Sequence, residues 1–199
     1  IETVPSRRQT QKQERRDKIF KTAMELFTTQ GFQNVTVTDI AKAAGVSRGT
    51  VFNYYPYKEA ILIGYFGERL KQVREQLEHH NLAPLEALYV IFENLASFTA
   101  ENKHFIVPIG YELLNPDPER SKQAFLSIPL AEMIYGFLTK AREHSLIRSD
   151  FSRERLSRTL ANTYFLTALQ WVSYRQDRSI HDELRKSLQL ALEGIVSQK

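Results

Sequence analysis

The sequence predicts an all-α protein of about nine helices, with a small three-helix head joined to a larger helical body. Three observations support this fold class. Apolar residues recur three or four positions apart through most of the 199 residues. Prolines and glycines mark the joints between these segments, and no stretch alternates as a half-buried strand would. In addition, residues 36–58 contain two short helical segments separated by a glycine.

Residues 36–58 have the pattern of a helix-turn-helix unit. Thr38 is the expected N-cap of a short helix that ends at Ala44. Gly45 follows directly, where a left-handed conformation closes the helix end and glycine adopts it without strain. Ser47 is the expected cap of a second helix, whose Val51 points into the core. Such a pair can place its second helix in the major groove of DNA.

The outward side of the second helix indicates DNA as the partner. Arg48 can pair with guanine, Gly49 lets the backbone approach the groove, and the nearby hydroxyls can reach phosphates. Helical hairpins with small residues also occur in proteins that do not bind DNA, and the outward arginine favours the DNA-binding interpretation. The candidate DNA-binding residues are Thr36, Thr38, Ser47, Arg48, Gly49, Thr50, Asn53, Tyr54 and Lys58.

The longer pattern around this unit resembles the N-terminal domain of the TetR family of bacterial transcriptional regulators. The resemblance covers roughly residues 14–65 and rests on Gly31-Phe32, residues 35–41, residues 44–55 and residues 58–62. Two departures are minor, since Phe52 stands where the family usually has tyrosine and Tyr55 where it usually has phenylalanine. Loss of the hydroxyl at position 52 removes one potential phosphate contact. The family implies an all-helical body with an effector pocket and a homodimer that binds DNA.

The positive charge of the chain is concentrated in its first third. Residues 1–60 contain 10 Lys and Arg against 6 Asp and Glu, so they carry the whole formal charge of +4. This asymmetry suits a DNA-binding head on a neutral body. Residues 1–13 lack apolar periodicity, and we expect a mobile basic arm there. The arm has two interpretations, a solvated tail or a segment that contacts DNA.

Beyond the arm, helices follow one another to the end of the chain. We expect a helix over residues 14–29, the short pair, and a long helix from Lys58 to His79. Proline-marked joints then separate the later helices, one of which should be kinked at Pro129. These later segments are 84–98, 103–114, 119–145, 152–174 and 179–197.

Composition and motifs argue against several other classes. The chain has no cysteine, which excludes disulfides and thiolate metal sites and suits the cytoplasm. It has no nucleophile elbow, phosphate loop or zinc-binding His pair, so we expect no enzyme, no cofactor and no metal. The adjacent His79 and His80 diverge on a helix and are better explained as offsetting its dipole. No uncharged run is long enough to span a membrane.

The body is rich in aromatic residues, which either fill a core or line a cavity. Polar groups lie among them in the sequence, and their burial without hydrogen-bond partners would cost free energy. A cavity between helices would relieve that cost. We therefore expect a pocket for a small apolar or aromatic effector. Its candidate residues are Phe92, Tyr111, Met133, Phe137, Asn162, Phe165 and Trp171.

The last two predicted helices carry the expected dimer interface. One is apolar on nearly every side and the other has a long apolar stripe, so a second copy is the expected cover. The TetR resemblance implies dimerisation through these same helices. The candidate interface residues are Leu160, Tyr164, Leu184, Leu188, Leu192 and Ile195.

We therefore expect three parts: a basic arm at 1–13, a helix-turn-helix DNA-binding domain at 14–57, and a ligand-binding and dimerisation domain at 58–199. The expected function is a ligand-responsive regulator, most simply a repressor that binds a palindromic operator as a homodimer and is released by a small effector. The alternative is an architectural or interaction protein of the same fold that binds DNA without an inducer. A body with no cavity would favour that alternative.

Overall fold

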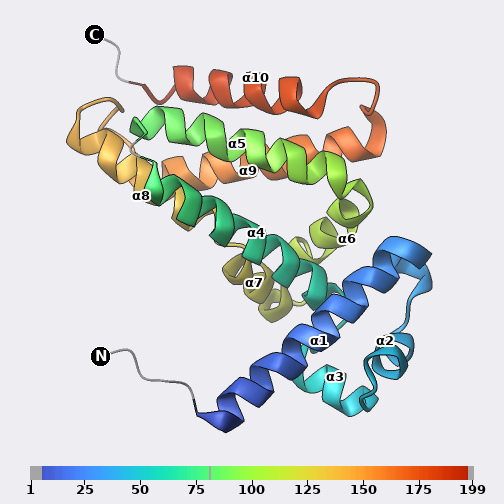
Figure 1. Ribbon diagram of the computed structural model, residues 1–199. Helices are drawn as coiled ribbons and strands as arrows, with labels where there is room; N and C mark the ends of the chain where they lie inside the picture. The colour runs from blue at the N-terminus through green and yellow to red at the C-terminus, as the bar shows by residue number, and fades with distance from the viewer. Residues whose placement is uncertain (1–5, 81, 197–199) are drawn as a thin grey trace. The chain divides into compact units, whose positions relative to one another are not determined.

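The computed structural model describes residues 6–80 and 82–196 and confirms the all-α fold class. Within these ranges the chain forms ten α-helices and one 3-10 helix but no strand, and a lone antiparallel bridge joins Ile147 to Val196. The chain divides into two compact units, Ile1–Leu62 and Ile63–Lys199. We call these units the head and the body (Figure 1).

The head is a three-helix unit built around the first helix. Its elements are α1 (Arg7–Gln30), η1 (Phe32–Asn34), α2 (Val37–Ala44) and α3 (Arg48–Tyr54). Helix α1 packs on α2, and α2 packs on α3. Ile19, Ala23 and Phe27 form the buried stripe of α1. The ring of Phe27 meets that of Phe32 edge-on at 4.9 Å between centroids, which joins the end of α1 to η1.

Helix α1 begins seven residues earlier than we expected, at Arg7 instead of Glu14. Ser6 caps it, because the Gln9 amide donates to the Ser6 hydroxyl and the Ser6 amide donates to the Gln9 side chain. This reciprocal capping box satisfies two amide groups that a helix start would otherwise leave unpaired. Residues 7–13 are therefore helical, while residues 1–5 of the expected arm lie outside the described residues.

The body contains α4 to α10. These helices are α4 (Glu59–His79), α5 (Pro84–Glu101), α6 (Lys103–Leu113), α7 (Pro118–Ser127), α8 (Leu130–Glu143), α9 (Arg153–Tyr174) and α10 (Ile180–Glu193). The first residues of α4 belong to the head. The expected kinked helix over 119–145 is instead two helices, because the chain leaves helical geometry at Ile128 and Pro129 becomes the N-cap of α8. Proline lacks the amide that would continue α7.

Helix α9 lies at the centre of the body. It contacts α5, α6, α8 and α10, and Figure 1 shows α5, α9 and α10 running side by side. Its largest fully buried side chain is that of Tyr164, whose hydroxyl hydrogen-bonds Thr99 of α5 at 3.1 Å while Thr99 donates to the Leu95 carbonyl at 2.8 Å. Burial raises the pKa of the Tyr164 hydroxyl above its usual value, so this group stays protonated.

Helix α4 approaches the end of α7 more closely than an ordinary side chain would allow. A Cβ atom built on Gly67 would lie 2.3 Å from the carbonyl oxygen of Ser127, the last residue of α7. Glycine at this position lets the two backbones meet. A Cβ atom built on Gly64, one turn earlier on α4, would have no neighbouring atom within 4 Å.

The two glycines of α4 provide a matched test of this contact. Gly67→Ala should lower the free energy of unfolding by about 1 to 3 kcal/mol, because α4 must shift away from a backbone carbonyl. Gly64→Ala should raise it by about 0.5 to 1 kcal/mol, since alanine favours the helix and meets nothing. Urea unfolding followed by circular dichroism measures both. Equal effects of the two substitutions would contradict the close contact.

Candidate nucleic-acid interface and effector pocket

Helix α2 is fixed at its start by a capping box between Thr36 and Asp39. The Asp39 amide donates to the Thr36 hydroxyl at 3.2 Å, and the Thr36 amide and hydroxyl donate to the Asp39 carboxylate at 2.8 and 2.6 Å. The side-chain bond from Thr36, followed by its backbone bond, lowers the pKa of Asp39. Thr36 is thus the N-cap, and our assignment of that role to Thr38 was wrong. Thr38 is an exposed residue in the first turn.

The turn between α2 and α3 forms as the sequence predicts. Gly45 is left-handed, with φ 66° and ψ 38°. Its amide donates to the Lys42 carbonyl at 3.2 Å, and the Val46 amide donates to the Ala41 carbonyl at 3.0 Å. These bonds satisfy carbonyls at the end of α2 and reverse the chain within a few residues.

Helix α3 presents a polar surface opposite its buried side. Ser47 caps the helix by accepting from the Thr50 amide at 3.0 Å, as predicted, and Val51 is buried. Arg48, Gly49 and Asn53 are exposed. Thr50 and Tyr54 are partly exposed beside them. The arrangement leaves a guanidinium, an amide and hydroxyls available to a duplex.

Lys58 is a partly buried residue whose ammonium is hydrogen-bonded within the head. Its ammonium donates to the carbonyl oxygens of Phe32 at 2.7 Å and Val35 at 3.0 Å, and it lies 4.1 Å from the centroid of the Phe32 ring. Desolvation lowers the pKa of Lys58. The side chain ties the segment after α1 to the start of α4, so we remove Lys58 from the candidate phosphate contacts.

A narrow apolar cavity lies in the body between α4, α6 and α9. It is lined by Phe66, Ile106, Ile109, Gly110, Tyr164, Phe165, Ala168 and Leu169. Its volume is about 10 Å³, which is room for about one water molecule. At its wall, a Cβ atom on Gly110 would lie 2.6 Å from a methyl group of Leu169. Glycine in α6 thus allows the leucine of α9 to fill most of the space.

Of the seven residues expected to line a pocket, the structure places one at this cavity, Phe165. Phe92 and Met133 are buried but do not line it, and Phe137 is only partly buried. Tyr111 is 71% exposed, and Asn162 is also exposed.

Trp171 is held by a bond within its own protomer, since its indole N–H donates to the Arg178 carbonyl at 2.7 Å. Of the seven cavity residues that were not predicted to line a pocket, one lies on α4, three on α6 and three on α9. Gly110, a glycine within an apolar helix, was the available signal for close packing there.

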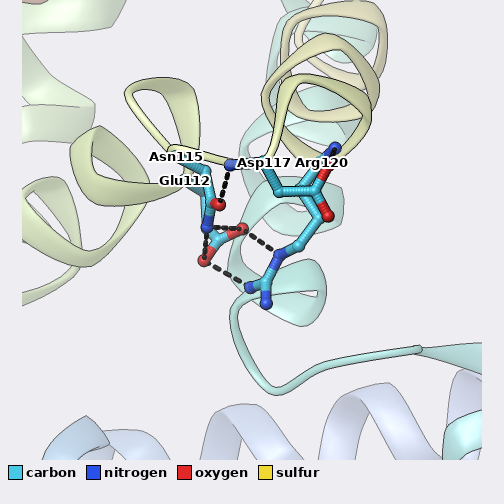
Figure 2. A network of polar contacts seen from close by, with 4 residues as sticks. All are labelled: Glu112, Asn115, Asp117 and Arg120. Carbon is cyan, nitrogen blue, oxygen red and sulfur yellow. Dashed lines mark hydrogen bonds and ion pairs between the residues drawn. The ribbon is translucent and has the colours of Figure 1, made fainter.

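The end of α6 is joined to α7 by a polar network around one buried carboxylate (Figure 2). Glu112 accepts from two guanidinium nitrogens of Arg120, at 2.6 and 3.2 Å, and from the Asn115 side chain at 3.3 and 3.4 Å. Asp117 caps α7 and its amide donates to Asn115 at 3.0 Å. The paired donors compensate the cost of burying the carboxylate and hold α6 and α7 in a fixed relation.

The stripe expected to face a second copy is covered within the protomer itself. Leu160, Tyr164, Leu184, Leu188, Leu192 and Ile195 are all buried in the single chain. They pack inside the body, where α9 and α10 meet each other and α5. The exposed apolar residues of these helices are others, Leu166 and Tyr174 on α9 and Leu190 on α10. Periodicity identified the apolar faces correctly but assigned them the wrong neighbour.

Among residues 6–80 and 82–196, no helix is long and apolar enough to cross a membrane. Within the same ranges no group of three or more His, Cys, Asp or Glu side chains could hold a metal ion.

The chain has an exposed polar recognition helix after a glycine turn, on a small helical head with a separate helical body. This arrangement defines the class of helix-turn-helix transcriptional regulators. The family model for the C-terminal domain of TetR/AcrR family transcriptional repressors matches residues 66–194. The model for bacterial regulatory proteins of the tetR family matches residues 19–64. The chain belongs to the TetR/AcrR family of transcriptional repressors, and it is a DNA-binding transcriptional regulator.

Individual relatives extend over nearly the whole chain. The crystal structure of Thermus thermophilus FadR, a TetR family repressor in complex with lauroyl-CoA, is 49% identical, covers 92% of this chain and 96% of that chain, and has a TM-score of 0.86. The fatty acid metabolism regulator protein of Bacillus subtilis is 25% identical over 93% of this chain and 97% of its own length. A Mycobacterium tuberculosis regulator associated by name with mycofactocin biosynthesis is 47% identical over 57 residues, only 29% of either chain.

Lys58 and Arg48 should respond differently to truncation. Lys58→Ala removes two charge-assisted hydrogen bonds and should lower the free energy of unfolding of the head by about 2 kcal/mol. Arg48→Ala should leave stability unchanged and reduce the preference for operator over random duplex by about 1 to 3 kcal/mol. Thermal unfolding and fluorescence anisotropy with labelled DNA separate the two effects. An Arg48→Ala protein that keeps its sequence preference would contradict base contact by Arg48.

Proposed function

We propose that the chain is a transcriptional repressor that binds a palindromic operator as a homodimer and is released from it by a fatty acyl-CoA thioester. The observation that carries the effector class is the 49% identity, over nearly the full chain, to a repressor crystallised with lauroyl-CoA. The apolar lining between α4, α6 and α9 is compatible with an acyl chain. A regulator that binds the bacterial chromosome works in the cytoplasm, and we assign the chain there.

Two heads of one dimer would read the operator together. We assign base contact to Arg48, close backbone approach to Gly49, and further contacts to Ser47, Thr50, Asn53 and Tyr54, which surround them. Thr36 and Thr38 are exposed at the start of α2 and remain candidates for phosphate contact. Twofold symmetry requires recognition helices in successive major grooves, about 34 to 36 Å apart.

Release requires the effector to bind preferentially to a conformation of the protein that differs from the one that binds DNA. The cavity is too small for an acyl chain, so binding must displace side chains such as Leu169 and Phe66. Phe66 lies on α4, whose first residues belong to the head, so a ligand that moves Phe66 can shift the helix leading to the head. The expected coupling between effector and DNA is about 1 to 3 kcal/mol.

The nearly closed cavity also supports the alternative, a regulator of the same fold that binds DNA without an inducer. The two candidates differ in one measurable property, the effect of an acyl-CoA on DNA affinity. Differential binding to two conformations is required for any such effect.

The dimer would form through the outer faces of α9 and α10. Leu166 and Leu190 are 60% and 71% exposed, respectively. The two helices are adjacent, since the Thr167 hydroxyl of α9 donates to Ser187 of α10 at 3.4 Å. A second copy would cover these leucines in a four-helix arrangement, which twofold symmetry closes.

Lauroyl-CoA should weaken binding of the wild-type protein to its operator, and Ile109→Phe should reduce this response. The larger ring fills the cavity, and the added strain raises the lauroyl-CoA concentration for half-release about tenfold, which corresponds to about 1.4 kcal/mol. Tyr111→Phe is the matched control on the same helix, because Tyr111 points to solvent. Anisotropy of a labelled operator measures release. A wild-type complex that lauroyl-CoA leaves intact would refute the acyl-CoA assignment.

Charge placed at two leucines of α10 should distinguish the interface from the core. Leu190→Glu should give a folded monomer, because the new carboxylate would be buried only in the dimer. Leu188→Glu should lower the melting temperature or prevent folding, because Leu188 is fully buried within one protomer. Sedimentation velocity and circular dichroism report both outcomes. A Leu190→Glu protein that stays dimeric at micromolar concentration argues against the assigned face.

A further inference from the structure

The first turns of α1 project beyond the core of the head. Every residue from 7 to 18 is exposed, and Ile19 is the first buried residue of the helix. At 1.5 Å per residue this projection is about 18 Å long. It is held locally, by the Ser6 capping box and by a hydrogen bond from Gln13 to Asp17 at 2.7 Å. Packing in the head does not account for it.

The net formal charge of the projection equals that of the whole chain, +4. Residues 7–18 contain six Lys and Arg against two acidic residues, and the formal charge of the whole chain is +4. Four of the six gather on one side of the helix. We call Arg8, Lys12, Arg15 and Arg16 the basic ridge.

The basic ridge lies on the side of α1 that faces α3. Residues seven positions apart share a helix face, so Lys12 is in line with Ile19 and Arg16 with Ala23, both buried against the rest of the head. Direct contact supports this orientation, since the guanidinium carbon of Arg16 lies 5.9 Å from the centroid of the Tyr55 ring, directly after α3. In Figure 1 the N-terminal end of α1 runs past α3.

The spacing of the ridge weakens the free helix and suits an anionic partner. Lys12 stands four residues from both Arg8 and Arg16, and like charges at this spacing repel. Phosphates of a duplex would relieve that repulsion. Because the ridge continues from the side of the head that carries α3, the nearest such phosphates are those of the DNA that α3 binds.

We infer that the basic ridge binds the phosphate backbone of the DNA that flanks each half-site, and that it does so as a helix. This inference rests on the proposed DNA binding by α3. It adds a contact that carries no sequence information, so it extends the footprint and raises affinity for every sequence alike. Two heads would give two such contacts in each dimer.

The test compares two lysines on opposite faces of α1 in the full-length dimer. Lys21 follows Lys12 by nine residues, which is about two and a half turns, and both side chains are exposed. Lys12→Ala should reduce the slope of log affinity against log salt by about two units, one for each head, and Arg8→Ala with Lys12→Ala by about four. Lys21→Ala should leave the slope as in the wild type. Lys12→Arg, which keeps the positive charge, should keep the slope of the wild type.

The DNA probes are a 40-base-pair random duplex and a duplex selected by the wild-type protein from a random library, each studied by anisotropy at about 50 to 200 mM salt. Lys12→Ala should weaken both equally, and trimming the flanks of the selected duplex should abolish the difference between Lys12→Ala and wild type. Circular dichroism checks that α1 remains helical, as alanine favours.

Failure of the ridge is distinguishable from failure of the proposed function. A Lys12→Ala protein whose slope matches that of Lys21→Ala, while Arg48→Ala loses sequence preference, would overturn the ridge and leave the function intact. A Lys12→Ala protein that no longer binds phosphatidylglycerol vesicles, but keeps the wild-type affinity and salt slope on DNA, would also overturn the ridge. Its partner would then be a membrane surface. A wild-type protein that selects no sequence from the library would refute the proposed function itself.

Discussion

The need to cover α9 on its apolar sides organises the body. This helix contacts α5, α6, α8 and α10, and its central Tyr164 hydroxyl is satisfied by Thr99 of α5. A buried hydroxyl without that bond would be costly, so the pair fixes how α5 and α9 pack. Once these four neighbours are in place, Leu166 remains uncovered on α9. The position proposed for the second copy follows from what the protomer cannot cover.

The same packing explains the state of the cavity. Gly110 of α6 lets Leu169 of α9 approach so closely that little space remains between them. Protein interiors are dense, and a site of this kind opens by displacing side chains into a second arrangement. An effector that opens it would act on Phe66, and so on α4, instead of filling a ready-made hole. Tight packing around the cavity is therefore compatible with a regulatory role.

The head uses its polar groups in two different ways. Lys58 and the pair of Thr36 and Asp39 hold the backbone together, with hydrogen bonds to carbonyls and amides that would otherwise lack partners. Arg48 and Asn53 are exposed, where a duplex can reach them. Lys58 thus has a structural role, Arg48 and Asn53 belong to the exposed surface, and Thr36 both caps α2 and remains exposed. The body is neutral overall, so the electrostatic attraction for DNA arises in the head.

Features that depend on a few neighbouring residues could be predicted from the sequence. The all-α class, most helix boundaries, the left-handed Gly45 and the Ser47 cap all follow from local periodicity, capping and backbone freedom. The start of α1 was also local, since Ser6 and Gln9 form a capping box that the sequence contains.

Which element covers each apolar face depends on how the helices pack in three dimensions. Periodicity shows that Leu188 lies on a buried stripe, but its cover could equally be the same chain or a second one, and the structure places it inside the protomer. The cavity residues come from three helices far apart in sequence, and the carbonyl partners of Lys58 lie more than twenty residues away. Such contacts depend on how helices pack together, which a pattern of 3.6 residues per turn does not contain.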